Sequence, residues 1–595
     1  MRRGIYRYLV KLRRLFPYAF GKYTTTITFA ILIGAVTGCT NIVFRYILDL
    51  VKRVIFIRGQ EILQIGYHND SRIFLPILPI LGAVLLIPLS KIFKGGVYGY
   101  RFPDFLEKVN LKGGIISFKS VLIRMIAPAL TIGSGGSAGV EGPIAQIGGG
   151  IGSLISQFLG TSAKQRTLMI AAGSAGAISA TFNAPITGVM FATEIILLGN
   201  YGMMSFGAVI ISAGIAAAIS NGYYGVNPTF IVPVSKTKSL FEMPLYLMLG
   251  LYMGVISVIY IKFFYWVKGF FEKLEINEHL KPIIGAFTIG LIGIIYPHVM
   301  SDGYEYIVQA LKGNYLFYLM LILVFVKIIA TSVTLGSGGA GGVFAPSLFI
   351  GAMAGGAFGS AVNHIFPLSI TSQFISPPGT YAAIGMGVFL ASVTHAPMTG
   401  MFLMFELTGN YQIMIPVMLS SATGVFMATR ILKDSIDTMA LTNRGIKLNE
   451  GLEETILSSI KVTDVMTTSF ETIDRDVSIN EAHDLMIMSK GLYFPVVNSE
   501  KELIGIISMN DIKSVVFDNK KKHVITAGDF CTKAAEVFTS EDNLNIALSR
   551  LSFIDLDEMP VVDVNNQKKV IGMISRSGIY STYYKKISHL HDDTR

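Results

Sequence analysis

Charged residues and cysteines are both scarce in this sequence. Asp, Glu, Lys and Arg make up 15% of its 595 residues, against about 25% in soluble globular proteins. Together with a hydrophobic fraction of 51%, this shortage of charge indicates a membrane protein. The two cysteines, Cys39 and Cys531, lie far apart in the chain, so no disulfide framework is expected.

The sequence also lacks the residue clusters that a membrane enzyme or a metal transporter would need. Its nine histidines are not spaced as metal ligands; His364 and His395, for instance, lie far apart. The apolar part offers no nucleophile–base pair. A magnesium transporter should carry several acids within its spans, whereas here the surplus is basic. We therefore expect neither an enzyme nor a metal site.

Charge is distributed unevenly along the chain. Residues 451–595 carry 22 acids and 16 bases, whereas residues 1–450 carry 17 acids and 33 bases. An excess of Lys and Arg in a membrane domain usually marks its cytoplasmic loops. We therefore do not interpret the basic residues as a nucleic-acid-binding surface, and we expect no nucleic-acid partner. The basic segment 1–23 leads into an apolar run without a signal-peptide cleavage site. We expect a multi-pass protein of the cell membrane with both termini in the cytoplasm and a soluble C-terminal part.

Parts of the apolar region occur twice in the same order. GSGGSAGVEGP begins at Gly133 and GSGGAGGVFAP at Gly336, and each is followed by a related stretch, NAPITGVMF or HAPMTGMFL. Several apolar segments are interrupted by Gly or Pro, which membranes tolerate only where the backbone faces protein or water. These patterns predict a duplicated, multi-pass α-helical transport domain over 24–445, with halves of about 24–235 and 236–445.

The C-terminal part contains a second, smaller duplication. LYFPVVNSEKELIGIIS, from Leu492, pairs with DEMPVVDVNNQKKVIGMIS, from Asp557. Each copy has two short β-rich runs with a turn between them, flanked by amphipathic helical stretches. The sequence therefore predicts a linker over 446–460 and two soluble α/β modules over 461–520 and 521–586.

The glycine-rich turns 133–143 and 336–346 are the first candidates for chemistry. A short glycine-rich segment that leads into a helix presents unpaired backbone N–H groups, which bind anions together with the helix dipole. Glycines can also serve only to let helices pack closely. The repetition, together with Pro143 and Pro346 at equivalent places, favours an anion site.

Three carboxylates stand alone in apolar surroundings: Glu141, Glu194 and Glu406. A charge at bilayer depth costs about 2.5–3.5 kcal/mol on insertion scales, so each is a functional candidate. Glu194 and Glu406 occupy equivalent repeat positions, which favours a shared structural role such as hydrogen bonding to a neighbouring backbone. Glu141 has no counterpart, because Phe344 and Ala345 stand there in the second copy. Asymmetry at a symmetric place predicts a specialised role for Glu141.

Taken together, these motifs resemble the CLC family of chloride channels and chloride/proton antiporters with a C-terminal pair of CBS domains. G-V-E-G-P at 139–143 is similar to the family's G-[KR]-E-G-P, and G-V-F-A-P at 342–346 to its G-x-F-x-P. The resemblance implies a CLC-type fold of tilted, partly broken helices in two inverted halves, as a homodimer with one anion pathway in each subunit. It implies transport of chloride or another small anion, with a proton as the second ion and no required cofactor.

The resemblance also implies roles for single residues. Glu141 is the gating glutamate, whose carboxylate competes with an anion and swings aside when it is protonated or displaced. Arg124 falls where the family carries a buried basic residue and would make the pathway more positive. The anion-binding positions implied are Gly99, Tyr100, Val140, Gly142, Val343 and Phe344.

Two positions depart from the family pattern in the anion pathway. Where the family has G-S-G-I-P, this chain has G-Y-R-F-P, with Tyr100 in place of the serine. Where the family has D-S-I-Y-T, Asp437 replaces the tyrosine. We hypothesise that Tyr100 supplies the phenol from the other side, while Asp437 pairs with Arg101 or faces water, because an unpaired Asp would repel a bound anion. The preference for chloride over nitrate or fluoride stays open.

A third departure concerns protons. Antiporters of the family usually carry an acid just after the residue that matches Glu194, near the inner proton entrance. Here that position is Ile195, which cannot carry a proton. Ile195 favours a passive channel, whereas the intact Glu141 favours an antiporter, and we take the antiporter as the working hypothesis.

The tail resembles CBS domains, which bind adenine nucleotides in the cleft between two units. Ser508 and Asp511 fit the family's Ser/Thr-x-x-Asp pattern in the first unit. The second unit offers Ser575, but Gly578 replaces the acid. We therefore expect at most one nucleotide site, and a purely structural tail is an equal alternative.

Overall fold

The computed structural model describes residues 22–65, 69–93, 96–199, 203–225, 242–366, 374–446, 448, 457–458, 460–489, 491–516, 525–533, 537–554 and 556–592. The chain forms two compact units, Met1–Arg444 and Gly445–Arg595, and each is described by itself. Most of the expected N-terminal segment 1–23 and of the expected linker 446–460 lies outside the described residues.

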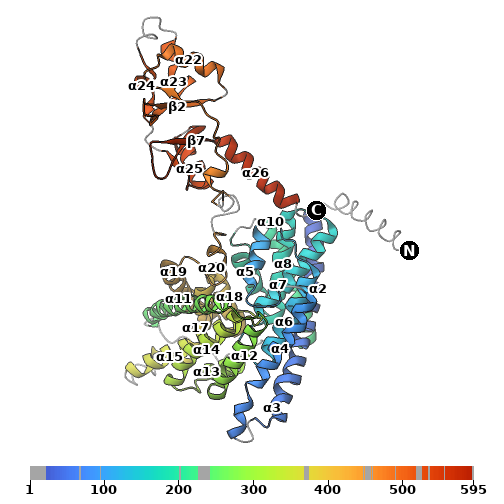
Figure 1. Ribbon diagram of the computed structural model, residues 1–595. Coiled ribbons are helices and arrows are strands. Elements are labelled where there is room, and N and C mark those ends of the chain that lie inside the picture. The colour runs from blue at the N-terminus through green and yellow to red at the C-terminus, as the bar shows by residue number, and fades with distance from the viewer. Residues whose placement is uncertain are drawn as a thin grey trace, which may run out of the picture. The chain divides into compact units, whose positions relative to one another are not determined.

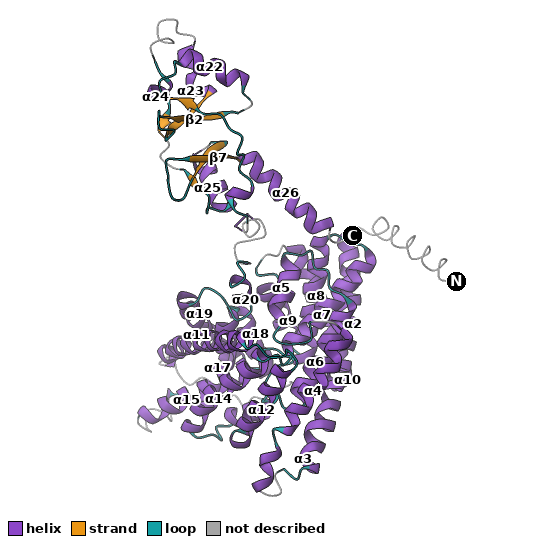
Figure 2. Ribbon diagram, in the orientation of Figure 1, coloured by secondary structure: helices purple, strands orange, loops and turns teal. Residues whose placement is uncertain are grey.

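The first unit is helical (Figures 1 and 2). The helices of its first half are α2 (Lys22–Val51), α3 (Arg58–Ile62), α4 (Ile77–Phe93), α5 (Phe102–Asn110), α6 (Phe118–Gly133), α7 (Glu141–Leu159), α8 (Ala163–Phe182), α9 (Pro185–Phe191) and α10 (Met203–Tyr224). Those of its second half are α11 (Met243–Lys273), α12 (Leu280–Ile295), α13 (Tyr304–Leu311), α14 (Phe317–Gly336), α15 (Phe344–Ile365), α17 (Pro378–Thr394), α18 (Pro397–Thr408), α19 (Met414–Ile431) and α20 (Met439–Thr442). Short π or 3₁₀ turns join several of them, including a π turn over Ala192–Ile196 that continues α9.

The two halves repeat the same local structure, which confirms the duplication predicted from the sequence. Helix α8 ends at Asn183, which has a left-handed backbone with φ of 54°, and α17 ends at His395 with φ of 56°. Two residues later, Pro185 and Pro397 begin α9 and α18, at the helix position where the missing N–H of proline costs nothing. The repeated N/H-A-P motif is therefore a helix stop followed directly by a helix start.

Close helix crossings in both halves depend on glycine. A methyl group on Gly148 of α7 would lie 2.2 Å from the carbonyl oxygen of Gly173 on α8. The equivalent pair in the second half is Gly351 of α15 and Gly385 of α17, where the same distance is 2.4 Å. Small residues allow backbones to approach this closely in membrane proteins. Both glycine-rich turns are thereby attached to rigid helix pairs.

The lone acids Glu194 and Glu406 connect the halves. The carboxylate of Glu194 accepts hydrogen bonds from the backbone N–H groups of Met398 and Thr399, at 3.0 and 2.7 Å, at the start of α18. Glu406 accepts the equivalent bonds from Ile186 and Thr187, at 2.8 and 2.7 Å, at the start of α9. Each acid therefore caps a helix of the other half, and the structural role predicted for this pair is confirmed.

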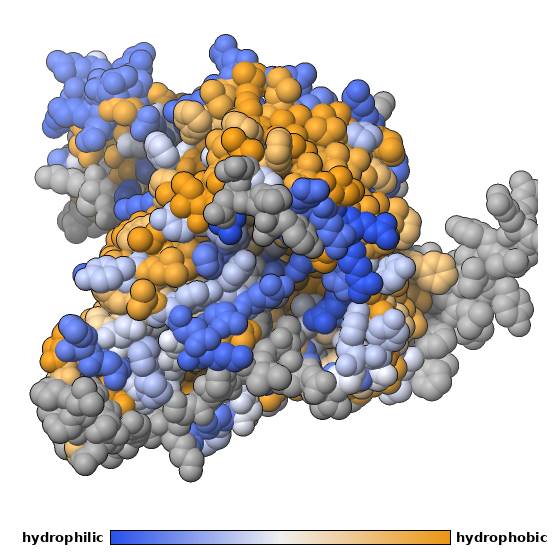
Figure 3. All heavy atoms as spheres, turned by 90° about the horizontal axis from the view of Figure 1, so that it is seen from below, coloured by the Kyte–Doolittle hydropathy of each residue, from blue (hydrophilic) through white to orange (hydrophobic). Residues whose placement is uncertain are grey.

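The surface of the first unit is apolar over long helices. Within the described residues, seven helical segments are long and apolar enough to cross a membrane: Thr24–Ile62, Ser71–Phe93, Phe206–Tyr224, Met243–Lys273, Phe317–Gly336, Phe344–Ile365 and Tyr411–Ile431. Large apolar side chains such as Leu32, Leu81 and Phe287 are exposed on these and neighbouring helices. Figure 3 shows hydrophobic residues over much of the face seen from below, crossed by hydrophilic side chains. This is the surface of a multi-pass membrane protein.

The second unit contains two small sheets with the same core topology (Figure 2). In the first, β1 (Ile473–Asp474) lies parallel to β2 (Tyr493–Val497), followed by antiparallel β3 (Leu503–Ser508) and β4 (Thr532–Lys533). In the second, β5 (Phe538–Thr539) lies parallel to β6 (Glu558–Val562), which pairs with antiparallel β7 (Val570–Ser575). The accompanying helices are α22 (Ile479–Met488), α23 (Met509–Val516), α24 (Ala527–Phe530), α25 (Leu544–Ile554) and α26 (Arg576–Asp592).

The two modules of this unit exchange their leading segments. Leu457 and Val462 are buried in the core of the second module, and Thr467 pairs with Met573 of β7 through backbone hydrogen bonds of 2.8 and 3.0 Å. Ala527, in turn, is buried in the core of the first module. The boundaries expected at 461–520 and 521–586 follow the sequence repeat, whereas the hydrophobic cores interleave across it.

Candidate functional site

The two glycine-rich turns meet directly in the first unit. Gly139 and Gly342 form an antiparallel bridge in which each N–H donates to the other carbonyl at 2.7 Å. Helix α7 begins two residues later at Glu141, and α15 begins at Phe344. The amide-rich starts of both helices therefore lie on either side of one bridge, and such starts favour anions.

Glu141 places its carboxylate at the start of α15. Its side chain is fully buried, and Oε2 accepts a hydrogen bond of 3.2 Å from the backbone N–H of Ala345. The Tyr304 hydroxyl donates a hydrogen bond to Oε1. Among the described residues, no basic side chain forms an ion pair with Glu141. Backbone and phenol donors hold this anion, as they could hold a free anion of similar size.

A short loop of the second half positions Tyr304. The N–H of Ser301 donates to Gly135 at 3.2 Å, which attaches the loop to the first glycine turn. The fully buried ammonium group of Lys327 donates to the carbonyl oxygens of Val299 and Ser301 at 3.0 and 3.2 Å. Sequence reasoning missed both Tyr304 and Lys327; the signal for Lys327 was a single lysine within the apolar run of α14.

Tyr100 and Asp437 form a second buried pair, and it corrects one hypothesis. The Tyr100 hydroxyl donates a hydrogen bond to Asp437, and the two residues are 6% and 4% exposed. Arg101 instead forms an ion pair of 2.9 Å with Asp104 on α5. The hypothesis that Asp437 pairs with Arg101 or faces water is therefore wrong. Arg101 is the residue directly before the first turn of α5. Asp104, three residues further along the chain, therefore lies within reach of its guanidinium group.

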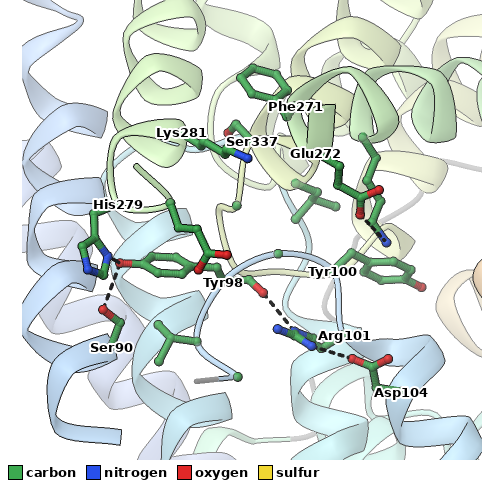
Figure 4. A pocket seen from close by; sticks show the side chains of 18 of the residues that line it. Ser90, Tyr98, Tyr100, Arg101, Asp104, Phe271, Glu272, His279, Lys281 and Ser337 are labelled. Atoms are coloured by element: carbon green, nitrogen blue, oxygen red, sulfur yellow. Dashed lines mark hydrogen bonds and ion pairs between the residues drawn. The ribbon is translucent and has the colours of Figure 1, made fainter. Parts of the chain in front are cut away.

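A cavity of about 350 Å³ lies next to Tyr100 (Figure 4). Gly99, whose N–H donates to Gly338 at 2.9 Å, contributes to its wall. On one side, the Tyr98 hydroxyl is hydrogen-bonded to His279 at 2.8 Å. The charged residues lining the cavity are Arg101, Asp104, Lys268, Glu272, Glu278, Lys281 and Arg444. Basic side chains make up the majority of them, which suits a vestibule for anions.

Arg124 faces a neighbouring cavity of about 270 Å³. Its side chain is 7% exposed, and its guanidinium group donates to the carbonyl oxygen of Gly96 at 2.5 Å. Lys108 and Lys119 line the same cavity, as does Arg101, which also lines the larger one. The buried guanidinium thus adds positive charge beside the vestibule, as the resemblance implies.

Comparison with known proteins gives the family. The family model described as "Voltage gated chloride channel" matches residues 81–429, and a CBS domain model matches residues 462–518. The chain belongs to the voltage-gated chloride channel family. The putative chloride channel protein ClcB-like of Ralstonia nicotianae is 30% identical over 372 residues, which cover 60% of this chain and 85% of that protein.

Antiporters are also among the similar proteins. The H⁺/Cl⁻ exchange transporter ClcA of Citrobacter koseri is 28% identical over 409 residues, covering 67% of this chain and 84% of that protein. The structure of a slow cyanobacterial Cl⁻/H⁺ antiporter has a TM-score of 0.63 at 22% identity, over 70% of this chain and 97% of that one. The CLC-type fold expected from the resemblance is confirmed.

Within this family fold, the structure brings most of the predicted pathway residues together. Val140 and Gly142 flank Glu141, and Val343 and Phe344 lie across the glycine bridge from them. Gly99 and Tyr100 lie at the vestibule. A row of aromatic rings links the two regions, with centroid distances of 6.5 Å for Tyr100–Phe102, 6.2 Å for Phe102–Phe191 and 6.2 Å for Phe191–Phe344.

Three further predicted residues are either apolar or hydrogen-bonded to each other. Ile195 is buried in the π turn that follows α9, with an apolar side chain. In the second unit, the Ser508 hydroxyl and backbone N–H both donate to Asp511, at 2.6 and 2.7 Å. A nucleotide at this place would have to replace these mutual hydrogen bonds.

Proposed function

We propose that this protein moves chloride across a membrane in exchange for protons, with Glu141 as the gating carboxylate. One observation carries the proposal: a fully buried carboxylate accepts hydrogen bonds at the start of α15, where the amides would otherwise hold an anion. Glu141 is thus both a competitor for the anion and a group that can carry a proton.

The exchange follows from the chemistry of that carboxylate. Ionised, it accepts charge-assisted hydrogen bonds from Ala345 and Tyr304. Protonation removes its charge and weakens those bonds, so a chloride ion can take its place among the amides of Val140, Gly142, Val343 and Phe344. Deprotonation returns the carboxylate and releases the anion. Chloride and the ionised Glu141 carboxylate therefore occupy the same site alternately, and each exchange is coupled to the binding or release of a proton.

The vestibule supplies the anion. Lys268, Lys281 and Arg444 raise the local concentration of chloride, with Arg124 contributing from the neighbouring cavity. Glycines at the bridge keep side chains away, so the ion contacts backbone N–H groups directly. Transport requires no cofactor in this scheme, and the protein is a transport protein rather than an enzyme.

A passive chloride channel is the second candidate function. The buried, apolar Ile195 favours it, because this residue cannot take up a proton where antiporters of the family usually carry an acid. A channel would open by the same displacement of Glu141 but would pass chloride without a stoichiometric proton.

Further proposals concern assembly, location and regulation. The resemblance supports a homodimer in the cell membrane with both termini in the cytoplasm. It also supports an adenine nucleotide at Ser508 and Asp511, which binding of a fluorescent ATP analogue to the full chain and to Asp511→Asn would test. Retained binding in Asp511→Asn would remove that site from the proposal.

The test of transport uses purified protein in liposomes, with chloride efflux and internal pH recorded together. Proton uptake driven by a chloride gradient, and lost in Glu141→Gln while chloride still moves, supports the antiporter. Chloride flux without proton movement in the unaltered protein supports the channel. Flux of fluoride or nitrate without chloride overturns the substrate assignment and directs attention to Tyr100 and Asp437.

A further inference from the structure

A second buried carboxylate lies beside the vestibule, where antiporters of the family usually have no acid. We propose that Asp437 is the inner proton-carrying residue of this pathway and takes over the task that Ile195 cannot perform. The inference rests on the proposed antiport function. Its basis is the contact of Asp437 with Tyr100, a residue that itself lines the vestibule.

Tyr100 lies between Asp437, to which it is hydrogen-bonded, and the vestibule that it lines. Figure 4 shows Tyr100 at the edge of the cavity, with its hydroxyl directed away from Tyr98 and His279. That hydroxyl donates to the Asp437 carboxylate, which is itself almost completely buried. Tyr100 therefore contacts both the cavity and the acid. In the proposed scheme, rotation of the Tyr100 ring brings water to the carboxylate.

Among the described residues, hydroxyl groups surround Asp437 and no basic side chain forms an ion pair with it. Tyr260 and Tyr265 of α11 are within electrostatic range of it, and the ring of Phe264 contacts Tyr100, Tyr260 and Tyr265 at centroid distances of 5.7, 6.4 and 5.2 Å. The Tyr265 hydroxyl donates to the carbonyl oxygen of Ile436 at 2.7 Å. The buried Tyr260 hydroxyl has no hydrogen-bond partner among the described residues and is free to bind a water molecule or an anion.

Two charged residues near Asp437, Asp434 and Arg444, are already bonded to other residues. Asp434 accepts a hydrogen bond of 2.7 Å from Thr442, and Arg444 forms an ion pair of 2.8 Å with Asp104. In the described part of the chain, no salt bridge involves Asp437. An acid without a counter-charge can change its protonation state without breaking an ion pair, which is what a proton carrier requires.

Three other buried or half-buried acids of the first unit are committed to structure. Glu194 and Glu406 each accept two backbone hydrogen bonds that cap a helix. Glu242 is fully buried and accepts hydrogen bonds from Ser376, Tyr246 and Tyr381, at 2.9, 3.0 and 3.2 Å for their hydroxyl groups. None of the three is a lining residue of the vestibule. Asp437 is therefore the candidate that combines burial with a neighbour on the cavity wall.

The proton balance is simple. The ionised carboxylate of Asp437 takes one proton from a hydronium ion in the vestibule, which leaves water. It later gives the same proton to water molecules that pass it toward Glu141, because the phenylalanine rings between the two acids cannot carry a proton. The aromatic row from Tyr100 to Phe344 runs between the two acids, since Phe344 directly precedes the Ala345 amide that holds Glu141. Neutral Asp437 does not repel an anion that leaves past Tyr100 into the vestibule. Protonation of Asp437 thus both takes up the entering proton and removes the negative charge that would repel the departing anion.

The experiment compares three variants in liposomes, with chloride efflux and proton uptake recorded on the same sample. Asp437→Asn keeps the shape and the acceptor for Tyr100 but cannot ionise, and chloride-driven proton uptake should fall at least about tenfold while chloride efflux is retained. Asp437→Glu keeps an acid and should retain proton uptake. Asp434→Asn is the matched control three residues away and should leave both fluxes unchanged.

The outcomes separate this inference from the proposed function. Absence of proton uptake in the unaltered protein overturns antiport itself, and with it any proton role for Asp437. Coupled transport in the unaltered protein and equally in Asp437→Asn overturns only the role of Asp437. Loss of proton uptake in Asp437→Glu as large as in Asp437→Asn overturns it too, in favour of a structural role.

Discussion

Tyr304 donates a hydrogen bond to the carboxylate of Glu141, although the two residues belong to different halves of the membrane unit. The phenol comes from the start of α13, and the loop before it is fixed by the buried Lys327 and by the first glycine turn. The Glu141 carboxylate, which gates the pathway in the proposed mechanism, is therefore held at the start of α15 by a donor whose position depends on both repeats.

Replacing Tyr304 by Phe should favour chloride in its competition with the Glu141 carboxylate. Hydrogen bonds to charged groups contribute about 1.5–3 kcal/mol, so we expect an apparent chloride affinity about tenfold higher at neutral pH. Isothermal titration calorimetry on the detergent-solubilised protein measures this affinity. Tyr306→Phe, on the same helix, is the control and should bind as the unaltered protein does. A lower affinity in Tyr304→Phe would mean that the hydroxyl serves the anion and not the carboxylate.

Chloride flux should rise as the pH falls. Protonation neutralises the Glu141 carboxylate and lets it leave the start of α15, so more sites are open to chloride at lower pH. In Glu141→Gln the side chain has no charge to lose, so the pH dependence caused by Glu141 should disappear and only a weaker dependence from Asp437 should remain. Chloride efflux from liposomes at matched internal and external pH, at several pH values, provides the measurement. A pH dependence that persists unchanged in Glu141→Gln would assign it to another group.

Glu194→Gln and Glu406→Gln should each destabilise the membrane unit by a similar amount. The amide group of glutamine would face backbone N–H donors, so one acceptor for a helix start is lost, at a cost of about 1–3 kcal/mol. Thermal unfolding in detergent should show a lower midpoint for both variants. Glu305→Gln serves as the control, because that side chain is 83% exposed. If only one of the two variants were destabilised, the equivalence of the caps would be contradicted.

Gly351→Ala should be far more harmful than Gly214→Ala. The new methyl group at Gly351 would lie 2.4 Å from the carbonyl oxygen of Gly385. That oxygen belongs to the backbone of α17, so it cannot move aside as a flexible side chain could. We expect a loss of about 3 kcal/mol or more, seen as aggregation or poor recovery of folded protein by gel filtration. Gly214 in α10 has open space around it, so alanine there should be neutral or stabilising by up to about 1 kcal/mol. Equal recovery of both variants would contradict the close crossing.

The sequence was sufficient to predict the parts of the fold that repeat. The duplicated glycine turns, the N/H-A-P breaks and the equivalence of Glu194 and Glu406 all depend on local patterns that occur twice. The isolation of Glu141 in an apolar stretch likewise pointed to the site where two helix starts meet.

Pairings between distant segments could not be predicted in this way. Asp437 and Tyr100 lie 337 residues apart, and only packing decides that the acid accepts from this phenol and not from the adjacent Arg101. Tyr304 stands in a helix of eight residues, and the sequence motifs that revealed the repeat lie outside this helix. The exchange of leading segments in the tail was missed because the repeat marks related sequences, whereas the cores depend on which segments pack together.

The reciprocal caps also make each half of the membrane unit depend on the other. A single repeat on its own would leave the start of its broken helix without the acid that satisfies it, and would carry an acid with nothing to cap. Two copies in opposite orientations remove both deficits at once. Neither half is therefore complete as a separate protein, and we expect the two halves to fold as one cooperative unit.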